Sequence, residues 1–351
     1  AEAGVNHNGD PDIAFKLVDA AISAGVDAVK FQTFKADKLV TADAPKADYQ
    51  INKTNKEESH LEMLKKLELS KEVTKELMSY CKSKKIDFLS TAFDSESLNF
   101  LADDLCLNTL KISSGDITNG PFLLEHSLKN VNLIISTGMA TFEEITDALG
   151  VVAFGLMNRS SKSASKSAFK DAFSSNIGKD LLRQKVTLLH CTSEYPAPFS
   201  DINLNAMKTM RERLGIKTGY SDHSQGNIVP IIAASLGASI IEKHFTIDRN
   251  LPGPDHKTSL NPNELKEMVE VIKTAVKVMG DGIKSPKKSE MKNQVIARKS
   301  LIAATKINKG DLFTELNLII KRPGTGISPM EYWDILNSKS SQDYNTGQVI
   351  L

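Results

Sequence analysis

The first 280 residues alternate short apolar, β-branched segments with longer segments of helical periodicity, and this alternation constrains the fold more than any other feature of the sequence. The predicted strands are residues 1–5, 28–32, 87–91, 109–112, 133–136, 186–190, 217–220 and 240–244. Apolar spacing of three and four predicts helices between them, most clearly at 13–24, 71–84, 143–152, 228–236 and 264–279. Eight βα units predict an α/β fold of the TIM-barrel type, (β/α)8, with a doubly wound sheet of six strands as the alternative.

Polar side chains collect just after the predicted strands instead of being scattered over the βα units. They include Glu2, Lys30, Gln32, Thr91, Lys111, Ser114, Asp116, Ser193, Tyr195, Ser221, His223, His244 and Asp255. In a parallel barrel the C-terminal strand ends face one mouth, where active sites are built. This distribution predicts one shared pocket.

Two segments interrupt the alternation. Residues 157–184 are rich in Ser and Lys and are longer than an ordinary connection, which predicts an exposed loop with an added short helix on the N-terminal face of the barrel. The polar, basic stretch after the barrel contains Gly and Pro and is typical of a linker, which we place at 281–296. The barrel domain then spans 1–280. A small α+β or mostly β domain spans 297–351, near the lower size limit for an independent core.

Composition and charge exclude several classes of protein. Lys and Arg number 44 against 43 Asp and Glu, so no overall field favours nucleic acid or an anionic membrane as a partner. No apolar run approaches the ~20 residues that a membrane span needs. Three cysteines without metal or redox spacing argue against a disulfide framework, so we expect a cytoplasmic protein. Because the sequence starts at Ala1 within a predicted strand, we also expect a few residues that complete this strand to precede it.

His223 and His244 stand at the ends of neighbouring predicted strands. Neutral imidazole is a common ligand of transition metals, and adjacent strand ends can place two imidazoles near one ion. Water or a carboxylate such as Glu2 could fill the remaining positions of an open site suited to Lewis-acid chemistry. The alternative is that both are hydrogen-bonded histidines at the top of the barrel.

Lys30 and Lys111 end apolar strands, where a long cationic side chain would point into the barrel mouth. Burying a lone ammonium group is unfavourable, so an anionic partner or an anionic substrate such as a phosphate is expected. Thr91, Ser114 and Ser221 add hydroxyl groups near helix starts, which are typical of an anion site. Two alternatives stay open: the lysines pair with barrel carboxylates, or one of them forms a Schiff base as in an aldolase.

A set of strings in the sequence resembles the sialic acid synthase family. In the barrel they are AEAGVNHNGD at 1–10, VKFQTFKADKL at 29–39, APKADYQ at 44–50, STAFD at 90–94, LKISSGD at 110–116, ISTGMAT at 135–141, LLHCTSEYPAPF at 188–199, GYSDHS at 219–224, IEKHFT at 241–246 and GPDHKTSL at 253–260. Beyond the linker, ARKSLIAATKINKGDLF at 297–313 and KRPGTGISPMEYW at 321–333 are similar to the antifreeze-like (SAF) domain of that family. The resemblance covers nearly the whole chain.

The resemblance implies a TIM barrel followed by an antifreeze-like domain. It also implies an enzyme that condenses phosphoenolpyruvate with an N-acylated amino sugar, giving a nine-carbon 2-keto acid and phosphate through carbon–oxygen cleavage. N-acetylmannosamine is then the expected sugar and N-acetylneuraminate the expected product, with the diacetamido precursor of legionaminic acid as the alternative. A Schiff-base pyruvate aldolase and a non-enzymatic sugar- or ice-binding protein are more distant alternatives.

Roles follow for the residues that match the family motifs. The implied phosphoenolpyruvate-binding residues are Lys30, Thr91, Lys111, Ser114, Ser193 and Ser221, and the implied sugar-binding residues are Gln32, Tyr195, Asp255 and Arg322. The implied catalytic residues are Glu2, Asp116, His223 and His244, of which the two histidines would hold Mn2+ or Mg2+. Ser193 and Asp116 depart from the family pattern, because relatives carry Asn and Glu at these places. Arg322 is expected to act on the active site of the other subunit in a domain-swapped homodimer.

Overall fold

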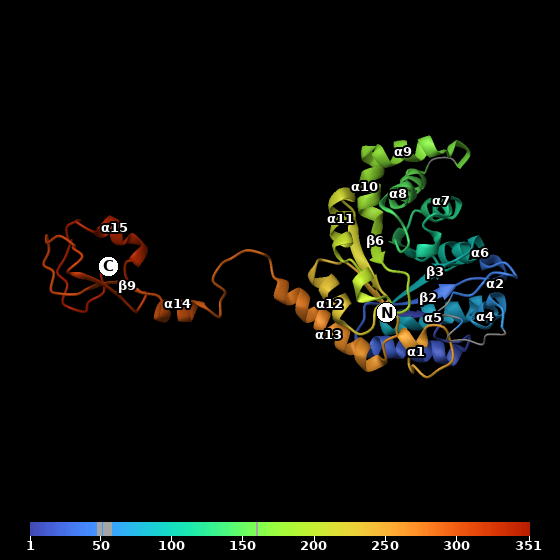
Figure 1. Ribbon diagram of the computed structural model, residues 1–351, viewed down its shortest axis with the longest axis horizontal. Coiled ribbons are helices and arrows are strands. Elements are labelled where there is room, and N and C mark those ends of the chain that lie inside the picture. Colours follow the sequence, from blue (N-terminus) through green and yellow to red (C-terminus); the bar gives the residue numbers. More distant parts are fainter. Residues whose placement is uncertain (48–50, 52–57, 159–160) are drawn as a thin grey trace. The chain divides into compact units, whose positions relative to one another are not determined.

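The computed structural model describes residues 1–47, 51, 58–158 and 161–351. Part of the APKADYQ string and two residues of the expected insertion therefore lie outside the described residues. The chain divides into two compact units, Ala1–Met279 and Gly280–Leu351 (Figure 1).

The first unit is a barrel of parallel strands in chain order. In the described residues the eight strands are β1 Glu2–Gly4, β2 Ala28–Thr33, β3 Asp87–Ala92, β4 Thr109–Ile112, β5 Asn132–Ser136, β6 Val186–Cys191, β7 Lys217–Asp222 and β8 Ile241–Lys243. A parallel bridge between Glu2 and His244, and a hydrogen bond of 3.0 Å from the Phe245 N–H to the Glu2 carbonyl, link the first and last strands. The TIM-barrel prediction is confirmed, and the six-stranded alternative is wrong.

Helices alternate with the strands and surround the barrel (Figure 1). They are α1 Pro11–Ala24, α2 Ala36–Leu39, α4 His60–Lys66, α5 Lys71–Lys84, α6 Ser95–Asn99, α7 Gly120–Leu128, α8 Phe142–Leu156, α9 Lys166–Ser174, α10 Asn176–Lys185, α11 Asn205–Leu214, α12 Ile228–Ser235 and α13 Pro262–Met279. Local chemistry sets their ends: the Asp10 carboxylate caps α1, and Gly25 ends it with a φ of 74°. In the part of the chain that the structure describes, no helix has both the length and the apolar content to cross a membrane.

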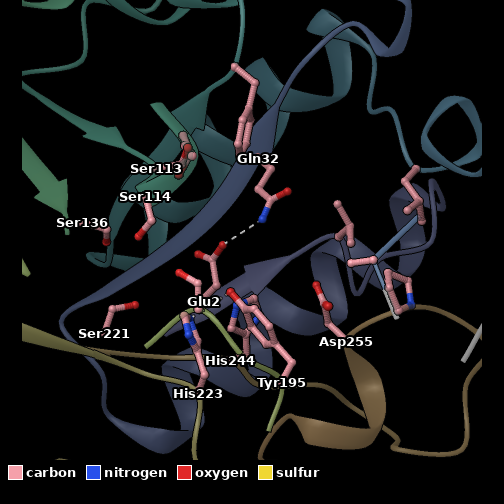
Figure 2. A pocket seen from close by; sticks show the side chains of 18 of the residues that line it. Glu2, Gln32, Ser113, Ser114, Ser136, Tyr195, Ser221, His223, His244 and Asp255 are labelled. Carbon is pink, nitrogen blue, oxygen red and sulfur yellow. Dashed lines mark hydrogen bonds between the residues drawn. The ribbon is translucent and has the colours of Figure 1, made fainter. Parts of the chain in front are cut away.

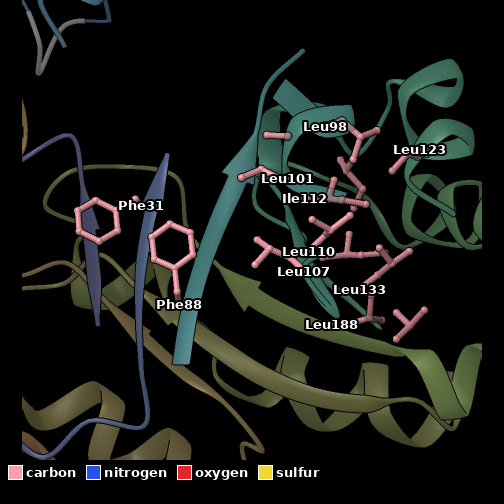
Figure 3. Close-up of a cluster of buried hydrophobic side chains, with 14 of the residues drawn as sticks. Phe31, Phe88, Leu98, Leu101, Leu107, Leu110, Ile112, Leu123, Leu133 and Leu188 are labelled. Atoms are coloured by element: carbon pink, nitrogen blue, oxygen red, sulfur yellow. The ribbon is translucent and has the colours of Figure 1, made fainter. Parts of the chain in front are cut away.

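The main core lies between the strands and these outer helices. Leu110, Ile112 and Leu133 on the strands are almost completely buried, and Figure 3 shows them beside Leu98 and Leu123 of the outer layer. Burying a side chain of this size is worth about 1.5–3 kcal/mol relative to leaving it exposed. Because side chains alternate along a strand, Lys111 between Leu110 and Ile112 faces the interior of the barrel instead of this core.

The segment between α8 and β6 is more ordered than the expected loop with one short helix. It contains two helices, α9 and α10. A Cβ atom at Gly150 of α8 would lie 3.0 Å from the Phe169 carbonyl oxygen, so this glycine permits a close approach of α9. α10 ends at Lys185, directly before β6, which connects the segment to the N-terminal end of that strand.

The second unit has a small core of its own. β9 Ser300–Ala303 pairs antiparallel with β10 Leu318–Lys321, and α15 Tyr332–Ile335 follows. Its buried apolar residues are Leu301, Ala303, Ile307, Phe313, Leu318, Tyr344 and Ile350. The helix α14 Met291–Ala297 occupies the end of the predicted linker, which is therefore not entirely irregular.

Candidate active site

A cavity of about 670 Å³ opens at the carboxyl ends of the strands. Twelve of the predicted site residues line it: Glu2, Lys30, Gln32, Thr91, Lys111, Ser114, Ser193, Tyr195, Ser221, His223, His244 and Asp255. Figure 2 shows Ser114 and Ser221 on one side of the cavity, Asp255 on the other, and Glu2, His223 and His244 between them. The barrel thus gathers in one place side chains that are far apart in the sequence.

Strand register sets the level of these residues in the barrel. The paired positions on neighbouring strands are Glu2 with Lys30, Gln32 with Thr91, Thr91 with Lys111, and Ser221 with Glu242. Because paired positions in a parallel sheet lie side by side, the acidic, basic and hydroxyl groups form one belt near the barrel mouth.

Lys30 and Lys111 are both buried in this belt. The Lys30 ammonium lies 2.6 Å from Glu2 Oε2 and 3.6 Å from Glu242 Oε2, and it donates to Thr91 Oγ1 at 3.2 Å. Burial by itself would lower the pKa of Lys30, but the charges of Glu2 and Glu242 outweigh it and raise that pKa. Burial lowers the pKa of Lys111, whose ammonium is 3.9 Å from Glu242 Oε1. The lysines therefore do have carboxylate neighbours, and they also line the cavity where an anion could bind.

Glu242 is a site residue that the sequence analysis missed. Its Oε1 accepts a hydrogen bond of 2.7 Å from Ser221 Oγ, and it lies between both lysines. Burial would raise the pKa of Glu242, but Lys111 and Lys30 together hold it well below its usual range. The available signal is its place two residues before His244, because positions i and i+2 of a strand share one face.

Glu2 is buried beside Lys30, and Gln32 Nε2 donates to its Oε1 at 3.4 Å (Figure 2). Burial raises the pKa of this carboxyl group, while Lys30 opposes the shift. A carboxyl group with a raised pKa can hold or release a proton nearer to neutral pH, which suits the predicted acid–base role.

The two histidines have the features of neutral metal ligands. His223 Nδ1 lies 2.7 Å from the Thr192 carbonyl oxygen, which makes this nitrogen the donor, and its Nε2 accepts from the Tyr195 hydroxyl at 3.0 Å. The His244 ring lies 5.8 Å from the His223 ring between centroids, and its buried Nδ1 has no hydrogen-bond partner. Burial lowers the pKa of both imidazoles. A neutral imidazole oriented by a backbone carbonyl, beside one with an orphaned nitrogen, fits a divalent metal ion.

Glu2 does not complete a set of three protein ligands. Among the described residues, His, Cys, Asp and Glu side chains form no group of three or more that could hold a metal ion. The Glu2 carboxylate is ion-paired with the Lys30 ammonium, which is 2.6 Å away. Two imidazoles would leave the other coordination positions to water or substrate, which is the open arrangement of a catalytic site.

Two of the predicted residues are not among those that line the cavity. Asp116 accepts from Ser113 Oγ at 2.6 Å and from Asn119 Nδ2 at 3.4 Å, so it stabilises its own turn, and burial raises its pKa. Ser113 lines the cavity in its place. Arg322 belongs to the second unit, where it is exposed and its Nε donates to the Ala297 carbonyl at 3.0 Å.

A parallel barrel with buried lysines, carboxylates and a pair of neutral imidazoles at its mouth defines an enzyme site for an anionic substrate. Residues 17–284 match the NeuB family, and residues 298–351 match the SAF domain. The chain belongs to the NeuB family and is a phosphoenolpyruvate-dependent nonulosonic acid synthase, which confirms the resemblance seen in the sequence.

Individual relatives resemble the chain over most of its length. An N,N'-diacetyllegionaminic acid synthase of Campylobacter jejuni is 46% identical, with 100% of this chain and 97% of that protein covered. A synthase of the same name from Legionella pneumophila is 43% identical, with coverage of 100% and 92%. The crystal structure of an N-acetylneuraminic acid synthetase from Leptospira borgpetersenii is 33% identical with a TM-score of 0.67, covering 84% of this chain and 88% of that one.

Proposed function

We propose that the chain condenses phosphoenolpyruvate with a diacetamido amino sugar and water, releasing N,N'-diacetyllegionaminic acid and phosphate. The sequence alone favours N-acetylneuraminate as the product. The Campylobacter and Legionella relatives, 46% and 43% identical, are instead named as N,N'-diacetyllegionaminic acid synthases, which supports the alternative.

The observation that carries the proposal is the pair of buried lysines beside hydroxyl groups at the barrel mouth. Lys30 and Lys111 can neutralise the phosphate and carboxylate of phosphoenolpyruvate, with the Thr91 hydroxyl, which accepts from Lys30, as a hydrogen-bond donor. The Ser221 hydroxyl lines the same part of the cavity and donates to Glu242 in the free site. Ser114 Oγ accepts from the Gly138 N–H at 3.0 Å and lies 3.1 Å from Cys191 Sγ, which fixes its hydroxyl group beside the same part of the cavity.

In the proposed reaction, C3 of phosphoenolpyruvate attacks the aldehyde carbon of the open-chain sugar and forms the new carbon–carbon bond. Water then adds at C2, and the bond between C2 and the bridging oxygen breaks to release phosphate. Glu2, whose pKa burial raises, would accept one proton of this water and return it to the oxygen of the former aldehyde, while the second proton leaves the C2 hydroxyl with the phosphate. Mn2+ or Mg2+, held by His223 and His244, would supply Lewis acidity toward the carbonyl oxygen of the sugar.

The experiment that tests this proposal is a sugar panel with phosphoenolpyruvate and added Mn2+ or Mg2+, with phosphate release and product mass as readouts. A diacetamido sugar should release phosphate and give the mass of the diacetyl nonulosonic acid. Phosphate release with N-acetylmannosamine but not with the diacetamido sugar would instead favour N-acetylneuraminate as the product. Trapping of pyruvate on the protein by borohydride would favour the aldolase.

The homodimer belongs to the same proposal, with Arg322 acting on the sugar in a partner's site. A planar guanidinium can bind acyl or hydroxyl oxygens, and the small second unit would gain burial in an exchanged dimer. Mixed His244→Ala and Arg322→Ala subunits should regain activity after exchange, because each heterodimer has one intact composite site. Proven heterodimers without recovered activity would show that Arg322 does not act in this way.

A further inference from the structure

The cavity has a second wall that the reaction with phosphoenolpyruvate does not use. We call it the apolar wall; it consists of Val5, Pro45, Met63, Leu64, Leu67 and Phe93. Val5, Met63, Leu64 and Leu67 are buried against one another in a separate apolar cluster, so their cavity-facing carbons are backed by a packed layer. Polar residues at strand ends, which mark the rest of the cavity in the sequence, give no sign of this wall.

Helix α4 and the residue that follows it provide half of the apolar wall, namely Met63, Leu64 and Leu67, and this helix is held firmly in place. Its first turn has a capping box in which Ser59 and Glu62 bond each other's backbone N–H. After its last turn, the Glu68 carboxylate accepts the Ala36 N–H at 2.7 Å. A Cβ atom at Gly9, where φ is 76°, would lie only 2.2 Å from the Lys66 carbonyl oxygen, so the turn after β1 packs directly on the end of α4.

The same turn connects the apolar wall with the sugar side of the cavity. Val5 is part of the wall, and three residues later Asn8 Oδ1 is 3.2 Å from Nε2 of His256, the neighbour of Asp255. Figure 2 shows Asp255 on the side of the cavity opposite Ser114 and Ser221. The turn after β1 therefore contacts both α4, which carries part of the apolar wall, and the segment that carries Asp255.

We propose that the apolar wall is the subsite for the second N-acyl group of the sugar, an inference that rests on the proposed function. The acyl methyl packs on Met63, Leu64 and Leu67, and a carboxylate oxygen of Asp255 accepts the adjacent amide N–H. A sugar hydroxyl in that place would lose its hydrogen bonds to water and gain none from aliphatic carbon. The wall therefore selects sugars that carry an acylated amine instead of a hydroxyl at the end remote from the reacting aldehyde.

The test on the unmodified chain compares three sugars by kcat/KM at saturating phosphoenolpyruvate. Two carry a formyl or an acetyl group on this second amine, and the third, N-acetylmannosamine, carries a hydroxyl in its place. One methyl or methylene group that enters an apolar pocket changes the ratio of kcat/KM between two substrates by about 10- to 200-fold. We expect the acetyl sugar to exceed the formyl sugar by about tenfold or more, and N-acetylmannosamine to be poorer still.

Variants of the wall provide the second arm. Leu64→Asn, of similar volume, should lower kcat/KM for the diacetamido sugar by about tenfold with little change in the KM of phosphoenolpyruvate. Leu61→Asn is the matched control, because Leu61 lies on the same helix and packs on the same cluster without lining the cavity. Thermal unfolding of both variants separates lost specificity from lost folding.

The outcomes distinguish this inference from the function on which it rests. Equal rates for the formyl and acetyl sugars, or a preference for N-acetylmannosamine, would overturn the subsite and leave the synthase intact. No phosphate release with any amino sugar would overturn both. An equal loss in the Leu61 and Leu64 variants would also count against the subsite.

Discussion

At the scale of single residues, the site depends on charged side chains that strand alternation turns inward. Lys111 faces the cavity because Leu110 and Ile112 face the core, and Glu242 and His244 share a face because one residue separates them. The intervening Lys243 points away from the cavity and is buried against Asp222. Side chains that line the cavity therefore alternate with buried side chains that pack outside it along the same short strands.

Lys111→Met should weaken phosphoenolpyruvate binding. Removing one charge from a buried, charge-paired anion site costs about 2–5 kcal/mol, or roughly 30- to 5,000-fold in the KM of phosphoenolpyruvate. The sugar KM should change much less. Steady-state kinetics should compare this variant with Lys217→Met. Lys217 is exposed and lies at the opposite end of a barrel strand. Equal KM values for the two variants would remove Lys111 from the anion site.

His244→Ala should abolish tight binding of Mn2+. Losing one of the two proposed protein ligands should weaken Mn2+ affinity by more than the ~10- to 100-fold typical of losing a supporting residue. Calorimetric titration of metal-free protein measures this without any turnover, with His190→Gln as the control, since His190 Nε2 instead bonds the Ile202 carbonyl. Unchanged Mn2+ affinity in His244→Ala would contradict the assignment of this ligand.

The residues that sequence patterns found are those at strand ends with obvious chemistry, such as Lys30 and His223. Glu242 escaped because its role depends on both lysines and Ser221, which meet it only once four strands are in register. For Asp116 the resemblance implies a catalytic role, which stays a prediction, and its carboxylate accepts a hydrogen bond of 2.6 Å from Ser113 Oγ in its own turn.

At the scale of elements, an ion pair joins the last two strands of the barrel. The Lys243 ammonium of β8 lies 2.5 Å from Asp222 Oδ2 of β7 and also donates to the Ser224 carbonyl, and both charged side chains are buried. Such a pair fixes the loop after β7, in which His223 lies.

Asp222→Asn should destabilise the barrel by about 3–5 kcal/mol, because it leaves the Lys243 charge buried without its partner. Urea denaturation measures this change. In the double variant Asp222→Asn with Lys243→Met, part of the stability should return, since no uncompensated charge remains. A double variant as unstable as the sum of both single variants would argue against a coupled pair.

The sequence predicts the positions of helices and strands well where the apolar periodicity is strong, and poorly where the periodicity is weak. The expected strand at 109–112 and helix at 71–84 coincide with β4 and α5, because apolar spacing and a Ser70 cap mark them. The helices α9 and α14 lie in Ser- and Lys-rich segments whose composition is that of a loop or linker. Contact with α8, which the sequence does not reveal, stabilises α9.

At the scale of the whole molecule, buried neutral histidines make stability depend on pH. Burial lowers the pKa of His7, His126 and His256 from 6.5 to about 4. As the pH falls below 6.5, the unfolded chain takes up protons that the folded chain does not bind until about pH 4. The contribution of these three histidines to the free energy of unfolding is therefore complete above pH 6.5, and it is lost progressively as the pH falls below 6.5.

The free energy of unfolding should thus fall between pH 6.5 and 4, by up to about 1.4 kcal/mol per pH unit for each histidine. The Nδ1 of His126 lies 2.9 Å from the Phe122 carbonyl. Replacing His126 with Phe should lower the slope of the free energy of unfolding against pH by up to about 1.4 kcal/mol per pH unit. Urea denaturation at pH 5, 6 and 7 measures both proteins. Identical slopes would mean that His126 is protonated in the folded state as well.

The central claim is that the barrel joins phosphoenolpyruvate to an amino sugar with cleavage of the carbon–oxygen bond. Phosphoenolpyruvate labelled with oxygen-18 at the bridging position, turned over with a diacetamido sugar and followed by phosphorus NMR and product mass, tests it most directly. We expect one label in the released phosphate and a diacetyl nonulosonic acid as product. Unlabelled phosphate, or turnover of phosphoenolpyruvate without a nine-carbon product, would contradict it.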